Sequence, residues 1–478
     1  MKQRPWLWSL ALFCLFFSIS AWAANSHADP IAPVILGVTG ILFFAVMGRF
    51  IARRFKQPSV LGELLMGIVL GNVGYWLGND FIQVLRQGPA IFEMVDFTLS
   101  GEPLRVAAVH ALGEKDAVSI LKILQGPGGP ALTQVAHTVD VFSRYGVIFM
   151  LFLIGLETSL GEMRQVGGVS LRVAIVGVIA PFVLGFMAAK VLMPELSINV
   201  DLFVAATLGA TSIGVSARVL SEMNILHCKE SRVILGAAVI DDILGLLMLA
   251  IVSGIIVSGE FELLGALKII GLAILFLLVC FKTGPSFLSF VIRLVSRLDI
   301  AEAKMFISFL FVMVLAWTAN LVGLATIVGA FAAGMILHDG YFKYWGDVED
   351  HRITIKDLIS PLEVILVPIF FVLIGLQVKL EAMFDPHVLI MATGLTIAAI
   401  LGKFISGFAT GPGIRSIAVG VGMIPRGEVG LVFASIGKSL GVINDALFSA
   451  LVMMVLVTTL ITPPVLKVVL FGCKKDEQ

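Results

Sequence analysis

Long apolar runs recur along almost the whole sequence, and they restrict the possible folds more than any other feature. A helix that crosses a bilayer needs about 20 mainly apolar residues, and about thirteen runs of roughly that length are present. Only 14% of the residues are charged, whereas a soluble domain has about 25%. We therefore predict an all-α polytopic membrane protein with about thirteen transmembrane helices. The predicted spans are 33–54, 59–77, 138–160, 168–193, 199–222, 233–257, 262–281, 304–321, 323–338, 361–379, 387–409, 413–440 and 444–471.

The first residues have the features of a secretory signal peptide. Lys2 and Arg4 precede an apolar run, and the sequence AWA at 21–23 matches a small-residue cleavage site. We predict a signal peptide at 1–23, and the alternative is an uncleaved first helix. Cleavage places the mature N-terminus outside the cell.

Lysine and arginine residues gather at alternate ends of the predicted spans. The first span ends in Arg53 and Arg54, so the positive-inside rule places that end in the cytoplasm. Alternation of the spans then places the tail, 472–478, in the cytoplasm. The signal peptide and the basic loops together predict the plasma (inner) membrane as the location. The one long outer loop, 78–137, contains an amphipathic stretch at 114–124, which we interpret as a solvated insertion or a dimer contact.

Two pairs of predicted spans have similar sequences in opposite orientations. FLIGLETSL (152–160) is similar to VLIGLQVKL (372–380), and SVLGELLMGIVL (59–70) is similar to TIVGAFAAGMIL (326–337). Both matches have an offset of seven spans, and an odd offset reverses the orientation. Inverted repeats of this kind are typical of secondary transporters, whose binding site lies between the repeats. The predicted parts are a first repeat of 33–222 plus 233–257, a connector helix and cytoplasmic loop at 262–303, and a second repeat of 304–471.

Two adjacent acids, Asp241 and Asp242, interrupt an otherwise apolar run, GAAVIDDILGLLMLAIVSGIIV. They lie about nine or ten residues from the cytoplasmic end of their span, which is roughly 14 Å into the membrane. One ionised Asp at that depth costs roughly 2.5–3.5 kcal/mol, so two in succession require a compensating function. Lys403 is a charge of opposite sign at roughly 9 Å depth in another span.

Polar residues also interrupt the fifth and twelfth spans, which are equivalent under the repeat. Thr211 and Ser212 lie midway along the fifth span, and Pro425 lies midway along the twelfth. Proline removes a backbone donor and disrupts the preceding turn. We therefore predict two discontinuous helices that cross at the membrane midplane and direct their dipoles at a bound ion.

Further charges flank the predicted break in the twelfth span. Arg426 and Glu428 follow Pro425, and we interpret them as an ion pair that supports the half-helix ends. Glu63 lies near the end of the second span, where we expect it to face water.

Adjacent helical residues point about 100° apart, so Asp241 and Asp242 must have different partners. We predict that one carboxylate pairs with Lys403 and that the other faces a water-filled cavity and binds a cation. Competition between a proton and a cation for one carboxylate is antiport in its simplest form.

These motifs together resemble those of the monovalent cation:proton antiporter family, in particular the electrogenic bacterial sodium/proton antiporters with two aspartates. The resemblance is carried by PSVLGELLMGIVLG, FLIGLETSL, ATSIGVSARVL, VIDDILGL, the Lys403 span and MIPRGEVGLV, in that order. It covers about residues 33–471.

The resemblance implies a core domain that moves like an elevator against a dimerisation domain, in a homodimer. It implies that Asp242 binds the cation and that Asp241 pairs with Lys403. Thr211 and Ser212 match the unwound fifth span, and Arg426 and Glu428 lie in the matching broken twelfth span.

The predicted function is therefore sodium (or lithium)/proton antiport, with protons and monovalent cations as substrates and Asp242 as the Na⁺ ligand. No cofactor is expected, no enzyme activity is predicted, and a net charge of +0 gives no reason to expect a nucleic-acid partner. Potassium/proton exchange is the first alternative. A cation channel and an intramembrane aspartyl protease are more remote, since the protease needs its two acids on separate helices.

Overall fold

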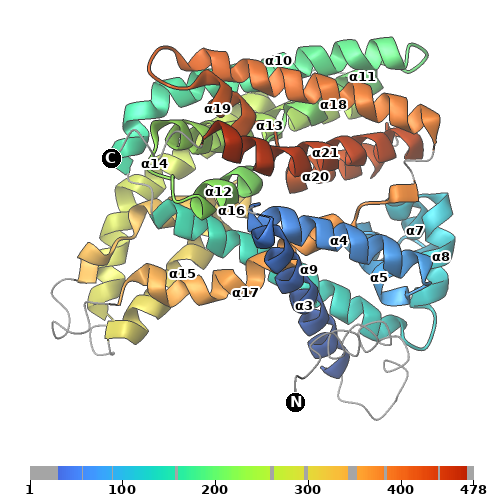
Figure 1. Ribbon diagram of the computed structural model, residues 1–478, viewed down its shortest axis with the longest axis horizontal. Coiled ribbons are helices and arrows are strands. Elements are labelled where there is room, and N and C mark those ends of the chain that lie inside the picture. Colours follow the sequence, from blue (N-terminus) through green and yellow to red (C-terminus); the bar gives the residue numbers. More distant parts are fainter. Residues whose placement is uncertain are drawn as a thin grey trace. The chain divides into compact units, whose positions relative to one another are not determined.

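The computed structural model is helical throughout the part of the chain that it describes (Figure 1). The predicted signal peptide, 1–23, and the tail, 472–478, lie outside that part. The all-α prediction is confirmed, as expected for a chain that must satisfy its backbone hydrogen bonds within each segment in lipid. The described residues are 31–55, 57–88, 90–156, 160–258, 263–294, 300–342, 353–381, 385–439 and 442–470.

Within these ranges, ten helical stretches are long and apolar enough to cross a membrane. The remaining three predicted spans fall on α13, on the shorter helix α16 and on the pair α19 and α20. The long helices and half-helices are α3 (Ala32–Arg54), α4 (Ser59–Trp76), α9 (Gly129–Leu156), α10 (Leu160–Leu192), α11 (Ile198–Gly209), α12 (Ile213–Glu222), α13 (Lys229–Ser258), α14 (Leu263–Leu294), α15 (Ile300–Leu321), α16 (Thr326–Ile336), α17 (Ile355–Leu376), α18 (Pro386–Ser406), α19 (Ser416–Gly422), α20 (Gly427–Ser439) and α21 (Asp445–Val469).

The chain divides into two compact units, and each unit takes segments from both predicted repeats. The first unit combines Met1–Tyr145, Ile365–Leu389 and Ala434–Leu456. The second unit combines Gly146–Val364, Ile390–Phe433 and Val457–Gln478.

In the first unit, the predicted outer loop is folded into a cap of four short helices. The amphipathic stretch at 114–124 forms the last of them. Ala108 of the cap and Val135 of α9 are fully buried and belong to one apolar core. Burial of this apolar surface explains why residues 78–137 fold into helices. The cap helices are α5 (Asp80–Leu85), α6 (Ala90–Leu99), α7 (Leu104–Leu112) and α8 (Glu114–Leu124).

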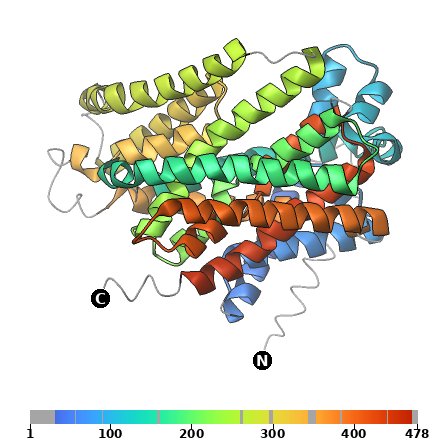
Figure 2. The same cartoon turned by 90° about the horizontal axis from the view of Figure 1, so that it is seen from above.

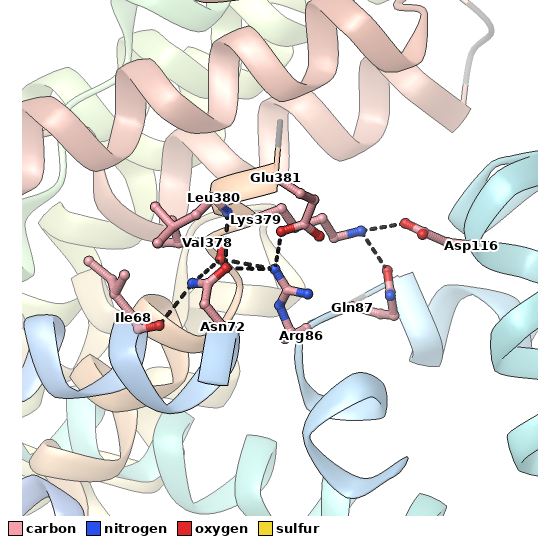
Figure 3. Close-up of polar contacts among 9 residues, drawn as sticks. All are labelled: Ile68, Asn72, Arg86, Gln87, Asp116, Val378, Lys379, Leu380 and Glu381. Atoms are coloured by element: carbon pink, nitrogen blue, oxygen red, sulfur yellow. Dashed lines mark hydrogen bonds and ion pairs between the residues drawn. The ribbon is translucent and has the colours of Figure 1, made fainter. Parts of the chain in front are cut away.

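A polar network joins this cap to the turn that follows α17 (Figure 3). The Arg86 guanidinium donates to Asn72 Oδ1 at 3.1 Å and to Glu381 Oε2 at 2.8 Å. Asn72 Oδ1 also accepts from the Leu380 amide at 3.0 Å, so one side chain satisfies both the turn and the arginine.

A second ion pair in the same region joins Lys379 to Asp116 of α8 (Figure 3). Lys379 Nζ also donates to Gln87 Oε1 at 3.0 Å. The turn after α17 therefore contacts the cap at two places, at Arg86 and at Asp116 of α8.

Paired glycines bring helices of the two repeats into backbone contact. A Cβ on Gly67 of α4 would lie 2.9 Å from Gly375 Cα of α17. Likewise, a Cβ on Gly155 of α9 would lie 3.0 Å from Gly334 Cα of α16. Small residues allow this close approach between helices in membranes. Since α4 matches α16 and α9 matches α17 in sequence, the two crossings are equivalent, which supports the predicted inverted repeat.

In the second unit, α10 and α18 lie side by side and antiparallel (Figures 1 and 2). A Cβ on Gly177 would contact Ser406, one on Gly402 would meet Pro181, and one on Gly394 would meet Leu192. This packing sets the position of α18, the helix that carries Lys403.

Candidate functional site

The fifth predicted span is broken at the two polar residues that the sequence singled out. α11 ends at Gly209, and α12 begins at Ile213. Ala210 and Ser212 have extended backbone conformations. Hydroxyl side chains offer backbone groups an alternative to helical hydrogen bonds, which explains a break at a Thr-Ser pair.

The twelfth predicted span is broken between α19 and α20. α19 ends at Gly422 and α20 begins at Gly427, with Pro425 between them. Gly427 has a φ of +43°, in the left-handed region that favours glycine. The predicted discontinuous helices are therefore present.

The two breaks are in direct contact. The Ser212 amide donates to the Pro425 carbonyl at 2.8 Å, and Ser216 Oγ donates to the Gly422 carbonyl at 2.5 Å. A Cβ on Gly427 would lie 2.7 Å from Ser212 Cβ, so only glycine fits at this point. Thr211 Oγ1 is 3.5 Å from the Met423 carbonyl and adds a weaker contact.

The adjacent acids lie on α13, close to this crossing. Lys403 Nζ of α18 donates to Asp241 Oδ1 at 2.7 Å, and both side chains are 0% exposed. Asp242 is also buried, at 6% exposure. Gly245, one turn beyond Asp241, would place a Cβ 3.9 Å from Ala210 Cβ, which brings the acids close to the break in the fifth span.

Buried charges of this kind are expensive unless they are paired and hydrogen-bonded. Asp241 Oδ2 has no hydrogen-bond partner among the described residues, although Oδ1 is paired. The site thus holds one satisfied ion pair with spare carboxylate oxygen beside a second buried acid. Oxygen atoms of this type are suitable ligands for a hard cation or for a proton.

The described partners of Arg426 are two backbone carbonyls. Its guanidinium is fully buried and donates to the Ala210 carbonyl, and to the Ala399 carbonyl at 3.2 Å. The side chain of the predicted partner, Glu428, lies outside the described part of the chain. Arg426 therefore satisfies a carbonyl at the broken end of α11 and ties it to α18, one turn before Lys403. A cation also favours the negative end of a helix dipole.

One contact at the crossing was missed by the sequence analysis. The Gly427 amide donates to Thr459 Oγ1 of α21 at 3.2 Å. Two adjacent threonines, Thr458 and Thr459, in an apolar run were the available signal, and both are 0% exposed.

Two broken helices that cross beside buried acids and a buried lysine are the arrangement by which many secondary transporters hold ions at the midplane. The profile of the family described as "Sodium/hydrogen exchanger, transmembrane" matches residues 40–472 of the chain. The chain belongs to this sodium/hydrogen exchanger family, which consists of transporters rather than enzymes.

Curated relatives cover nearly the full chain. The sequence is 34% identical over 462 residues to the "High-affinity Na(+)/H(+) antiporter NhaS3" of Synechocystis, covering 94% of this chain and 92% of that protein. It is 33% identical over 441 residues to the "Na(+)/H(+)-K(+) antiporter GerN" of Bacillus cereus, covering 91% and 95%.

A solved structure shares the fold. The sodium proton antiporter MjNhaP1 from Methanocaldococcus jannaschii is similar with a TM-score of 0.54 and 15% identity, covering 93% of this chain and 98% of that one.

Proposed function

We propose that the protein exchanges sodium (or lithium) for protons by alternating access, with Asp242 as the shared binding group. The observation that carries this proposal is the buried Asp241–Lys403 pair, 2.7 Å long, next to Asp242 and close to two crossed helix breaks. The names of the Synechocystis and Bacillus cereus relatives support sodium as a substrate.

The arrangement leads to a charge balance for the exchange. In the proton-loaded state, Asp242 is protonated and the Asp241–Lys403 pair is neutral overall. When Na⁺ binds, Asp242 gives up its proton and Asp241 turns from Lys403 to the cation. An ammonium left alone in a site of low dielectric constant is costly, so Lys403 then releases its proton. Two protons leave for one cation, and each cycle moves one net charge.

The helix breaks contribute fixed partial charges. Arg426, just before α20, donates to the carbonyl of Ala210, just after α11, so a helix C-terminus and a helix N-terminus lie beside the same crossing. In transporters with broken helices, carbonyl groups at the breaks can ligate a cation, and the amide groups can stabilise carboxylates.

A vesicle assay tests the proposal. Purified protein is reconstituted with an imposed proton gradient, and dequenching of a pH dye is followed after adding Na⁺, Li⁺ or K⁺. The wild type should respond to Na⁺, and Asp242→Asn should not. Asp201→Asn is the matched control, because Asp201 is a buried helical aspartate like Asp242 but lies near the start of α11, in a pair with Lys190 at 3.6 Å. A full Na⁺ response in Asp242→Asn contradicts the proposal.

The same assay separates the alternatives. A response to K⁺ alone identifies the potassium/proton exchanger, an alternative that the name of GerN also supports. Cation flux that proceeds without any proton movement identifies a channel.

We further infer an inner-membrane homodimer with the mature N-terminus outside and the C-terminus in the cytoplasm. The basic residues at the predicted inner ends of the spans support this orientation. If an impermeant thiol reagent labels Cys473 in intact cells, the C-terminus is outside and the inferred orientation is wrong.

A further inference from the structure

The last described helix, α21, places a hydroxyl group directly against one of the helix breaks. Thr459 is fully buried, and its Oγ1 accepts a hydrogen bond of 3.2 Å from the amide of Gly427, the first residue of α20.

This contact satisfies a group that α20 cannot satisfy itself. The first amides of a helix have no partner within the helix, and a polar side chain just ahead usually caps them. The residue ahead of Gly427 is Arg426, whose side chain has no acceptor. Thr459 therefore acts as an N-cap that is supplied by another helix.

Gly427 transmits the effect of this contact to the other break. Its φ is +43°, and a Cβ there would lie 2.7 Å from Ser212 Cβ. Two residues earlier, Pro425 accepts the hydrogen bond from the Ser212 amide. Fixing the Gly427 amide thus fixes the direction in which α20 starts and the contact between both interrupted helices.

We propose that Thr459 is a positioning residue for cation/proton exchange, which holds the crossing in the shape that binds the ion. This proposal rests on the proposed function. Thr459 acts through the Gly427 backbone and is not itself a ligand of the cation.

Three variants test the role of the hydroxyl in the reconstituted antiporter. Thr459→Val keeps the shape but removes the acceptor, whereas Thr459→Ser keeps the acceptor. Thr462→Val is the matched control, since Thr462 is equally buried in the same helix and donates to the Thr458 carbonyl at 2.7 Å.

The expected result is a change in apparent affinity that serine does not cause. Thr459→Val should raise the KM for Na⁺ about five- to tenfold with a much smaller change in kcat, the size expected for one buried hydrogen bond. Thr459→Ser and Thr462→Val should stay near the wild-type KM. An unchanged KM in Thr459→Val, or an equal rise in Thr462→Val, overturns the proposal.

Hydrogen exchange provides a measurement that does not depend on the folding of a variant. In the wild type, the Gly427 amide proton should exchange slowly with solvent, because the amide donates a hydrogen bond to Thr459 Oγ1. Rapid exchange there overturns the positioning role even if Thr459→Val fails to fold. The Asp242→Asn variant keeps the two proposals apart. In Asp242→Asn, ion exchange should be lost while the slow hydrogen exchange of the Gly427 amide stays unchanged.

Discussion

At the scale of single residues, the pair between Asp241 and Lys403 is the main electrostatic feature of the site. Both side chains are 0% exposed. Breaking such a pair by removing one member leaves a charge buried without compensation, which costs about 3–5 kcal/mol. Replacing both members removes that penalty. The pair is thus better suited to control a charge than to stabilise the fold.

Lys403→Met and Asp241→Asn should each lower stability by about 3–5 kcal/mol, whereas the double variant should lose less than either single variant. Thermal unfolding in detergent measures the effect. Lys403→Met should also make the exchange electroneutral, because the second proton carrier is gone. A membrane potential would then no longer drive Na⁺ uptake by vesicles. Additive losses in the double variant, with transport still driven by potential, contradict this prediction.

At the scale of helices, backbone contact at glycines determines where elements cross. Gly67 and Gly375 approach so closely that any side chain forces α4 and α17 apart. Gly168, on α10, has no atom within 4 Å of a Cβ built on it. Gly67 is therefore a crowded position and Gly168 an open one, and a substitution to alanine can be compared at both.

Gly67→Ala should destabilise the protein by about 1–3 kcal/mol through overpacking. Gly168→Ala should be neutral or stabilising by up to about 1 kcal/mol, since alanine is the better helix former. Unfolding midpoints of the two purified variants measure the difference. If both variants unfold at the same temperature, the close approach of α4 and α17 is wrong.

The elements were predictable from sequence to different degrees. Apolar runs mark helices clearly, and Pro425 marks one break, because proline cannot continue the hydrogen-bond pattern. The cap was only partly predictable, since short amphipathic helices need tertiary contacts to become stable. The two carbonyl partners of Arg426 were not predictable, because a sequence does not show which carbonyls a broken helix leaves free. The predicted pair of Arg426 with Glu428 stays a prediction.

Burial near a helix end was also difficult to predict. The expectation that Glu63 faces water is wrong, because its side chain is 0% exposed and pairs with Arg49 of α3 at 2.8 Å. Arginine lies fourteen residues earlier, too far along the chain for a helical spacing to indicate the pair. The ion-binding roles of Asp241, Asp242 and Lys403 stay predictions.

At the scale of the whole molecule, the cap of the first unit is attached to the turn after α17 by two ion pairs of unequal burial. Arg86 is 2% exposed and its partner Glu381 is 37% exposed. Lys379 and Asp116 are 26% and 35% exposed. Of these four side chains, only Arg86 is cut off from water. Loss of the Glu381 carboxylate therefore leaves a buried charge unpaired, whereas loss of Lys379 or Asp116 does not.

Glu381→Ala should therefore cost about 1–3 kcal/mol, whereas Lys379→Ala should cost at most about 1 kcal/mol. Limited proteolysis of residues 78–137, alongside thermal unfolding, measures how firmly the cap is attached. Equal sensitivity of the two variants contradicts the assigned importance of Arg86.

The glycine crossings also have a consequence for how the chain is assembled. Each crossing joins a helix of one sequence half to a helix of the other, α4 with α17 and α9 with α16. Neither half contains the surface that its own glycines need. Two fragments made from separate genes and divided within the connector at 262–303 should consequently be inert alone and regain exchange when co-expressed.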